Sequence, residues 1–126
     1  MLDQTARLTY LYVGSSDVEA DLKFYRDRLG GKIVWRAEAF ETEVAAVELG
    51  EGPLLLLADH EPAPGVILIW AVEDLDRAVA SLKNAGWPGP ERRVEVPDGP
   101  CLLLADASGN RVGLLQQTRP NVMLKE

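Results

Sequence analysis

The chain has 126 residues, a formal net charge of −7 and a single cysteine, Cys101. Its length suits one domain, and 47% hydrophobic with 26% charged residues is the balance of a folded protein, not a disordered one. The acidic charge argues against nucleic-acid binding, because no basic stripe is present to displace phosphate counterions, and a lone cysteine excludes an internal disulfide.

The first half of the chain predicts a strand, a helix and three further strands. Residues 8–13 are rich in β-branched and aromatic side chains, which is typical of a strand. Ser16 and Glu19 form a capping-box pattern, so we expect a helix to begin there. Its buried face should carry Val18, Leu22, Tyr25 and Leu29, and Gly30 and Gly31 should end it. The further strands are expected at residues 32–36, 42–49 and 54–58.

The second half repeats this order of elements. Residues 66–72 read as a strand, and Glu73 and Asp74 place acid at the start of a second helix. That helix has an apolar stripe and ends at Gly86, and strands are expected at residues 92–96, 101–105 and 110–116; the stripe consists of Leu75, Ala78, Val79 and Leu82. Superposing Asp17 on Asp74 aligns the two halves at an offset of 57 positions.

The repeat predicts an α+β fold of two βαβββ modules, at about residues 6–60 and 65–118, within a single domain that spans residues 1–126. A βαβββ unit covers one face of its sheet with its helix and leaves the other face bare. Two such units can enclose a cleft between curved mixed sheets, and such a cleft is the natural place for a ligand.

Three segments resemble the glyoxalase/bleomycin-resistance superfamily, also called the vicinal-oxygen-chelate superfamily. Residues 17–30 (DVEADLKFYRDRLG) are similar to its first helix, and residues 72–76 (VEDLD) to the start of its second. Residues 106–110 (DASGN) are similar to the turn before its last strand, except that Ala107 replaces a proline. The resemblance extends from about residue 7 to residue 117 and implies that superfamily's fold; the superfamily hosts several reactions on this one fold.

The resemblance also identifies where a metal would be bound. Metal-dependent members place histidine or glutamate at four strand positions around one divalent ion, which chelates adjacent oxygens of the substrate. The matching positions here are Tyr10, Leu56, Ile67 and Gly113. A phenol, two aliphatic side chains and a glycine do not form such a centre, so we predict no metal, no other cofactor and no catalytic residue of this type.

Four further residues leave their roles open. His60, the one histidine, is either a ligand or general base, or an exposed turn residue at a strand end, and the second interpretation is favoured. Trp35 and Trp87 are aromatic walls of a ligand site or, preferably, core or interface residues. Cys101 is either a core thiol, which is favoured, or a reactive nucleophile.

Strand alternation selects the residues that would face the cleft. The predicted ligand-binding residues are Tyr10, Tyr12, Ile67, Ile69, Arg111 and Gly113. They form an aromatic and aliphatic surface with few polar groups, as small-molecule sites often do.

We therefore predict a small-molecule-binding protein, metal-free and non-catalytic, that sequesters an aromatic or cationic ligand as a homodimer. The alternative within the same superfamily is a metal-dependent lyase, isomerase or dioxygenase. Metal-free catalysis, or a regulatory or structural dimer without ligand, remains open. The sequence shows neither a bilayer-spanning apolar run nor a signal peptide, so we expect a cytoplasmic protein without membrane contacts.

Overall fold

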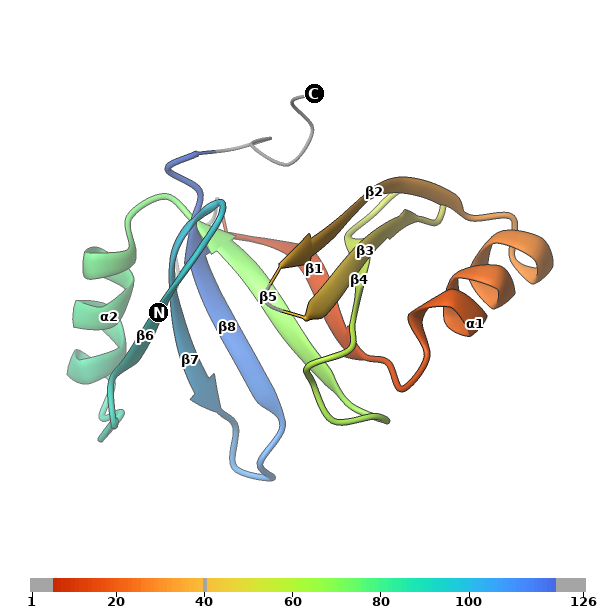
Figure 1. The fold of residues 1–126 in the computed structure, drawn as a ribbon. Helices are drawn as coiled ribbons and strands as arrows, with labels where there is room; N and C mark the ends of the chain where they lie inside the picture. The colour runs from red at the N-terminus through yellow and green to blue at the C-terminus, as the bar shows by residue number, and fades with distance from the viewer. Residues whose placement is uncertain (1–5, 40, 120–126) are drawn as a thin grey trace. The chain divides into compact units, whose positions relative to one another are not determined.

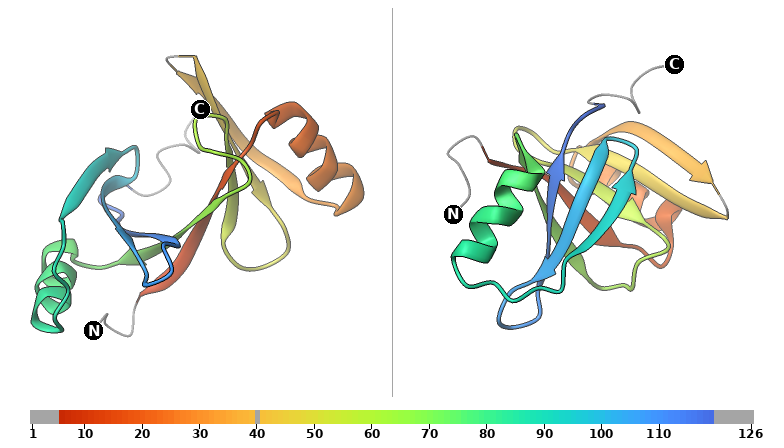
Figure 2. Two further views of the ribbon diagram at one scale, coloured as in Figure 1. Left: turned by 90° about the horizontal axis from the view of Figure 1, so that it is seen from below. Right: turned by 90° about the vertical axis from the view of Figure 1, so that its left-hand side faces the viewer.

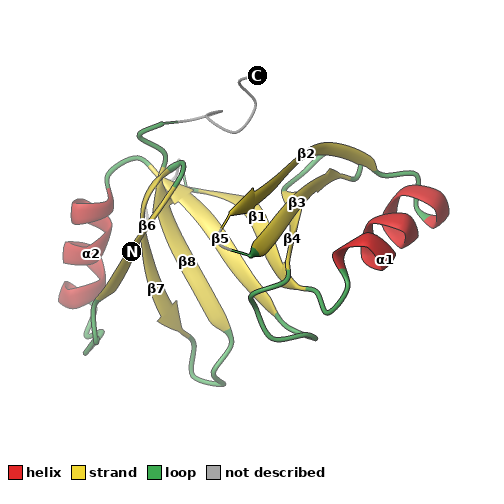
Figure 3. Cartoon of the chain, viewed as in Figure 1, coloured by secondary structure: helices red, strands yellow, loops and turns green. Residues whose placement is uncertain are grey.

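The computed structural model describes residues 6–39 and 41–119 (Figure 1). Its contacts divide the chain into two compact units, each of which is described by itself. The N-terminal unit contains Thr9–Ile67, and the C-terminal unit contains Leu68 onward together with the residues before Thr9. Strands and helices follow the order βαβββ twice (Figure 3).

The N-terminal unit is a four-stranded mixed sheet with one helix. Its strands lie in the order β2-β3-β4-β1, with β1 parallel to β4 and the other pairs antiparallel. The helix α1 continues directly into the π-helical turn η1. The elements are β1 (Arg7–Gly14), α1 (Val18–Lys23), η1 (Phe24–Arg28), β2 (Lys32–Ala39), β3 (Thr42–Glu48) and β4 (Leu54–Ala58).

One face of this sheet and α1 enclose an apolar core. Val18 and Leu22 of α1 pack with buried residues of β3 and β4, and Leu11 and Val13 of β1 pack against the same cluster. The strand contribution to the buried cluster is Ala45, Val47, Leu55 and Leu57. Alternate residues of each strand therefore point to the opposite face, away from α1.

The C-terminal unit has the same arrangement of elements. Its strands lie in the order β5-β8-β7-β6, and α2 packs on the sheet through Leu75, Ala78 and Val79, which meet Leu102 and Leu114. Trp70 and Trp87 are partly buried against this second core, so Trp87 belongs to the core as the favoured interpretation predicts. The elements are β5 (Val66–Val72), α2 (Leu75–Asn84), β6 (Arg92–Val96), β7 (Gly99–Ala105) and β8 (Arg111–Gln116).

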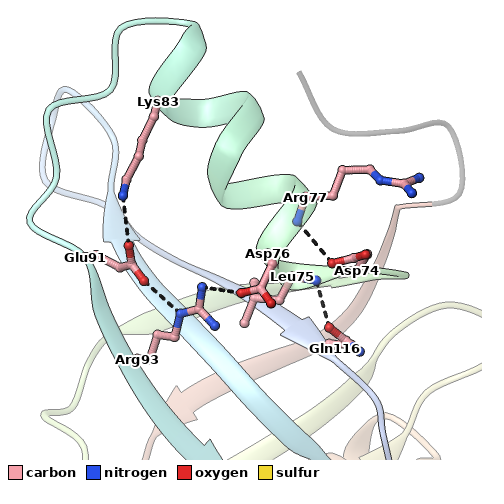
Figure 4. A network of polar contacts seen from close by, with 8 residues as sticks. All are labelled: Asp74, Leu75, Asp76, Arg77, Lys83, Glu91, Arg93 and Gln116. Carbon is pink, nitrogen blue, oxygen red and sulfur yellow. Dashed lines mark hydrogen bonds and ion pairs between the residues drawn. The ribbon is translucent and has the colours of Figure 1, made fainter.

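Polar contacts fasten α2 to its sheet (Figure 4). Arg93 of β6 joins Asp76 at one end of α2 (2.8 Å) to Glu91 (2.9 Å), and Glu91 bonds Lys83 at the other end of the helix (3.2 Å). The Gln116 side chain accepts a hydrogen bond from the Leu75 amide at 2.8 Å. Figure 2 shows α2 beside this sheet in two further views, and the helix contacts β7 and β8.

The turn before β8 is closed by its own side chains. Asp106 Oδ1 accepts hydrogen bonds from the amides of Ser108 (3.0 Å) and Asn110 (2.8 Å), and the Asn110 side chain donates to Asp106 Oδ2. Gly109 has a positive φ of 91°. These contacts define the turn, and Ala107 in place of the superfamily's proline leaves them intact.

The predicted fold class, two βαβββ modules, is confirmed. The 57-position offset is also confirmed. Asp17 and Asp74 are the N-caps of the two helices, and Leu22 and Val79, which the offset aligns, are buried residues of α1 and α2. The predicted cap at Ser16 is wrong. Asp17 accepts the hydrogen bond from the Ala20 amide instead, because its backbone is extended and its carboxylate lies over the open end of the helix.

The prediction that Leu29 is buried is also wrong, since 53% of it is exposed. The spacing rule assumed 3.6 residues per turn, but η1 makes the wider π-helical turn from Phe24 to Arg28, which changes the direction of the side chains that follow. Tyr25 still packs against the N-terminal core. In the part of the chain that the structure describes, no helix is long and apolar enough to span a bilayer.

Replacing Asp17 or Asp74 by alanine should cost about 1 kcal/mol of stability each, because each carboxylate satisfies an amide at a helix start. Urea unfolding measures both. Glu73→Ala removes an exposed carboxylate beside the second cap without removing a cap bond, and serves as the control. Equal stability of Asp74→Ala and Glu73→Ala would contradict the assignment of Asp74 as the N-cap of α2.

Candidate functional site

The sheet face opposite α1 carries the aromatic residues of β1. Leu11 and Val13 pack on the helix side, so Tyr10 and Tyr12 point to the other face, as predicted. Tyr12 lies beside Leu56 of β4, which lies beside Ala46 of β3. Ala46 and Leu56 are buried, so the middle of this face is packed with aliphatic side chains.

A β-bulge places Trp35 at the end of the same row. Ile33 pairs with Val47, but the next pair is Trp35 with Ala46, which leaves Val34 as an extra residue in β2. If Val34 were paired in a regular strand, strict alternation would turn Trp35 to the same side as Ile33, toward α1. We call the surface formed by Tyr10, Tyr12, Trp35, Ala46 and Leu56 the aromatic face. Trp35 is absent from the predicted ligand-binding residues, because no residue pattern in the sequence marks the bulge.

Tyr12 forms a hydrogen-bonded pair with His60. The phenol oxygen lies 2.8 Å from His60 Nε2, although the two residues are 48 positions apart in sequence. The rings lie with their centroids 5.7 Å apart, and a Glu61 carboxylate oxygen lies 4.0 Å from the same nitrogen. His60 lies in an exposed turn after β4, as the favoured interpretation predicts, but its hydrogen bond to Tyr12 was not predicted.

Backbone bonds hold the segment that carries His60. The Ser15 amide donates to the Ala58 carbonyl at 2.9 Å, and the Gly14 amide donates to the Gly65 carbonyl at 3.0 Å. A Cβ at Gly14 would lie 2.0 Å from the Pro62 carbonyl oxygen, so this close approach requires glycine. The turn is thereby fixed at both ends against β1, and the imidazole is held beside Tyr12.

The surroundings of Tyr12 raise its pKa to about 12. Burial is the largest cause, and the negative charges of Glu61 and Asp59 add to it, since all three disfavour a phenolate. The hydroxyl therefore stays protonated at neutral pH. The same carboxylates give the phenol oxygen a negative electrostatic environment.

Stability should consequently fall in alkaline solution. A pKa raised from 10.0 to about 12 favours the protonated phenol in the folded state, so its contribution is complete below pH 10 and is lost as the pH rises toward 12. We expect Tyr12→Phe to lose less stability than the wild type between pH 10 and 12. Urea unfolding at several pH values measures both slopes, and identical slopes would contradict the assigned shift.

In the C-terminal unit, the predicted residues Ile69 and Gly113 lie against each other. A Cβ at Gly113 would lie 3.3 Å from Ile69 Cγ1 and 3.2 Å from Cys101 Sγ. Leu102 and Leu114 pack toward α2, so Gly113 points to the face away from the helix. Arg111 is two residues from Gly113 on the same strand and shares its face. Ile67, also predicted, is buried at the end of the N-terminal unit.

Cys101 occupies the space beside Gly113 as a buried thiol. It is 2% exposed, and burial raises its pKa to about 11. Only the thiolate is an effective nucleophile, so a thiol with this pKa is unreactive at neutral pH. The favoured interpretation of a core thiol is in agreement with this position.

The four positions that hold metal in related enzymes do not fit a divalent ion here. They are Tyr10, Leu56, Ile67 and Gly113, of which only the phenol has a donor atom. At Gly113, neighbouring sulfur and carbon atoms already surround the place of a ligand side chain. Within residues 6–39 and 41–119, no three His, Cys, Asp or Glu side chains are grouped as a metal would require.

Comparisons with solved structures give matches to this fold at low sequence identity. A hypothetical protein, BH1468 from Bacillus halodurans C-125, has a TM-score of 0.77 and 14% identity, covering 92% of this chain and 97% of that one. Methylmalonyl-CoA epimerase from Mycobacterium tuberculosis has a TM-score of 0.73 and 18% identity, covering 94% and 93%. A glyoxalase/bleomycin resistance protein/dioxygenase superfamily member from Vibrio splendidus 12B01 has a TM-score of 0.64 and 15% identity, covering 89% and 98%.

Sequence comparison identifies the family. No curated protein matches the sequence significantly. A family model described as Glyoxalase/Bleomycin resistance protein/Dioxygenase superfamily matches residues 6–114, which include the first βαβββ repeat and the second as far as the middle of β8. The chain therefore belongs to the glyoxalase/bleomycin resistance protein/dioxygenase superfamily.

Proposed function

We propose that the protein is a metal-free, non-catalytic member of this superfamily that binds and sequesters an aromatic or cationic small molecule. The observation that carries the proposal is the set of side chains at the four metal positions. Tyr10, Leu56, Ile67 and Gly113 lack the imidazole and carboxylate donors of a divalent-ion centre. Chelation of a substrate's adjacent oxygens has no basis in these residues.

The aromatic face supports a planar ligand. Trp35 and Tyr12 lie at the two ends of one row across the sheet, with small and aliphatic side chains between them. Flat rings stack on aromatic side chains, and apolar surfaces with a few placed polar groups are typical of small-molecule sites. The proposed binding residues are Tyr10, Tyr12, Trp35, Ile67, Ile69, Arg111 and Gly113. The protein is further proposed to act as a cytoplasmic homodimer.

A thermal-shift screen tests the proposal. A ligand that binds only the folded protein raises its Tm, so aromatic, glycopeptide and quinone-like compounds are added in the presence of a chelator. At least one class should raise the Tm of the wild type and raise it less for Trp35→Ala. Trp87→Phe, whose ring packs against the α2 core, is the control. No shift from any compound would contradict the proposal.

The alternative is a metal-dependent lyase, isomerase or dioxygenase. The similarity in fold to methylmalonyl-CoA epimerase, at 18% identity, is the observation in its favour. This alternative requires a stoichiometric divalent ion. Elemental analysis of protein loaded with Zn²⁺, Ni²⁺, Mn²⁺ or Fe²⁺ decides between the two functions, and tight binding of one ion per chain would support the enzyme.

A further inference from the structure

The hydrogen-bonded pair of Tyr12 and His60 has no place in the superfamily's metal positions, yet it lies at one end of the aromatic face. Tyr12 takes part in that face through its row with Leu56, while His60 comes from the turn after β4. The nearest metal position, Tyr10, is two residues away on β1. The pair is therefore a separate polar group beside an apolar surface.

We infer that the Tyr12–His60 pair, with Glu61, binds the cationic hydrogen-bond donor of a planar ligand, such as an amidinium or a protonated amine. This inference rests on the proposed function and specifies the charge of the ligand and the place of its polar end. It follows from three features: the acceptor that remains on the phenol oxygen, the charges around the pair and the fixed position of the turn.

The hydrogen bond between Tyr12 and His60 leaves an acceptor for the ligand. The phenol oxygen lies 2.8 Å from His60 Nε2, and in either tautomer of the imidazole it keeps at least one lone pair. A ligand group that donates a hydrogen bond, such as N–H, complements this lone pair.

The charges around the pair favour a cation. Glu61 lies 4.0 Å from His60 Nε2, and Asp59 is the residue before His60. Both carboxylates raise the pKa of the Tyr12 hydroxyl, as a negative electrostatic potential does. Asp59 is itself held at β3 by the Glu43 amide at 2.9 Å, and the Glu43 carboxylate is paired with Arg36. An aromatic phenol face and nearby carboxylates together bind organic cations.

The position of the pair is fixed before any ligand arrives. The turn is fastened through Gly14 to Gly65 and through Ser15 to Ala58. A site whose groups are already oriented loses less conformational entropy on binding. The ligand therefore binds to Tyr12 and His60 side chains that are already in position, and does not have to order the turn.

Three isosteric probes test the inference: benzamidine, which is a cation, benzamide, which is neutral, and benzoate, an anion. Because the chain has one histidine, His60 gives a single set of imidazole NMR signals that report binding at this place. We expect benzamidine to bind about ten times more tightly than benzamide and benzoate to bind weakest at pH 8.

Two carboxylate variants provide a matched comparison. Glu61→Gln removes the charge beside His60, and Glu51→Gln removes one from the exposed turn at the opposite end of β4. Glu61→Gln should remove most of the preference for benzamidine over benzamide, and Tyr12→Phe should do the same, while Glu51→Gln should leave it unchanged. Amide NMR spectra confirm that each variant is folded.

The outcomes separate this inference from the proposed function. Equal affinity for the three probes, equal effects of the two carboxylate variants, or benzamidine binding without a change at His60 would each overturn the inference. In all three cases a shift of Tm with a neutral aromatic compound would still support ligand binding at the aromatic face. Failure of the whole thermal-shift screen would instead contradict the proposed function.

Discussion

Replacing Gly14 by alanine is expected to lower the free energy of unfolding by about 3 kcal/mol. The added Cβ would lie 2.0 Å from the Pro62 carbonyl oxygen and 2.6 Å from its carbonyl carbon. Both are backbone atoms, which cannot rotate away as a flexible side chain can. Relief requires the turn to move off β1, and this movement would break the bond from the Gly14 amide to the Gly65 carbonyl.

The substitution should also separate Tyr12 from His60, since the displaced turn carries the imidazole. Urea unfolding measures the stability change, and the single histidine's NMR signals measure the local one. Gly109→Ala is the control, because φ is positive there but nothing lies within 4 Å of the new Cβ. It should cost about 1 kcal/mol. A Gly14→Ala variant as stable as Gly109→Ala would show that the close approach is not present.

Introducing the missing ligand by Gly113→Glu is expected to destabilise the protein by about 3 kcal/mol and to create no metal site. The new side chain would start 3.2 Å from Cys101 Sγ and 3.3 Å from Ile69 Cγ1, in a buried position. Its carboxylate would lose water, and the side chains that surround its first carbon, Cys101, Ile69 and Leu103, include no basic group. Unfolding curves with and without Zn²⁺ measure both effects.

A double-mutant cycle isolates the packing part of this cost. Gly113→Ala should destabilise the wild type by about 1 to 2 kcal/mol, because Cys101 and Ile69 must give way. In a Cys101→Ala background the same change should cost less, since the sulfur atom is gone. Strict additivity of the two substitutions would contradict this packing, and stabilisation of Gly113→Glu by Zn²⁺ would contradict the loss of the metal site.

Sequence periodicity predicted most of the fold because buried and exposed residues alternate regularly. Strands at residues 54–58, 66–72 and 92–96 have the predicted bounds, and the acidic residues Asp17 and Asp74 mark equivalent helix starts. The predictions that proved wrong concern places where the backbone departs from regular helix geometry or where a neighbouring residue forms the cap. The π-helical turn η1 altered the direction of Leu29, and an adjacent acceptor, Asp17, replaced the predicted cap Ser16.

The candidate site was predicted only in part, for a related reason. Alternation along single strands identified Tyr10, Tyr12 and Gly113, because their faces follow from the core residues beside them. The bond between Tyr12 and His60 joins residues 48 positions apart and depends on how the turn after β4 folds back. The pattern of neighbouring residues carries no information about a contact between positions so far apart in one sequence.

The extra residue in β2, Val34, marks a place where we expect the chain to tolerate a deletion. Ile33 packs in the core under α1, and Arg36 pairs with Glu19 of the same helix at 3.2 Å. These residues are an odd number of positions apart, so an uninterrupted strand would send them to opposite sides. Val34 resolves the conflict by occupying a position without a partner. Deleting Val34 should therefore shorten the strand while every other side chain keeps its side, so this is one place where the protein tolerates a change in length.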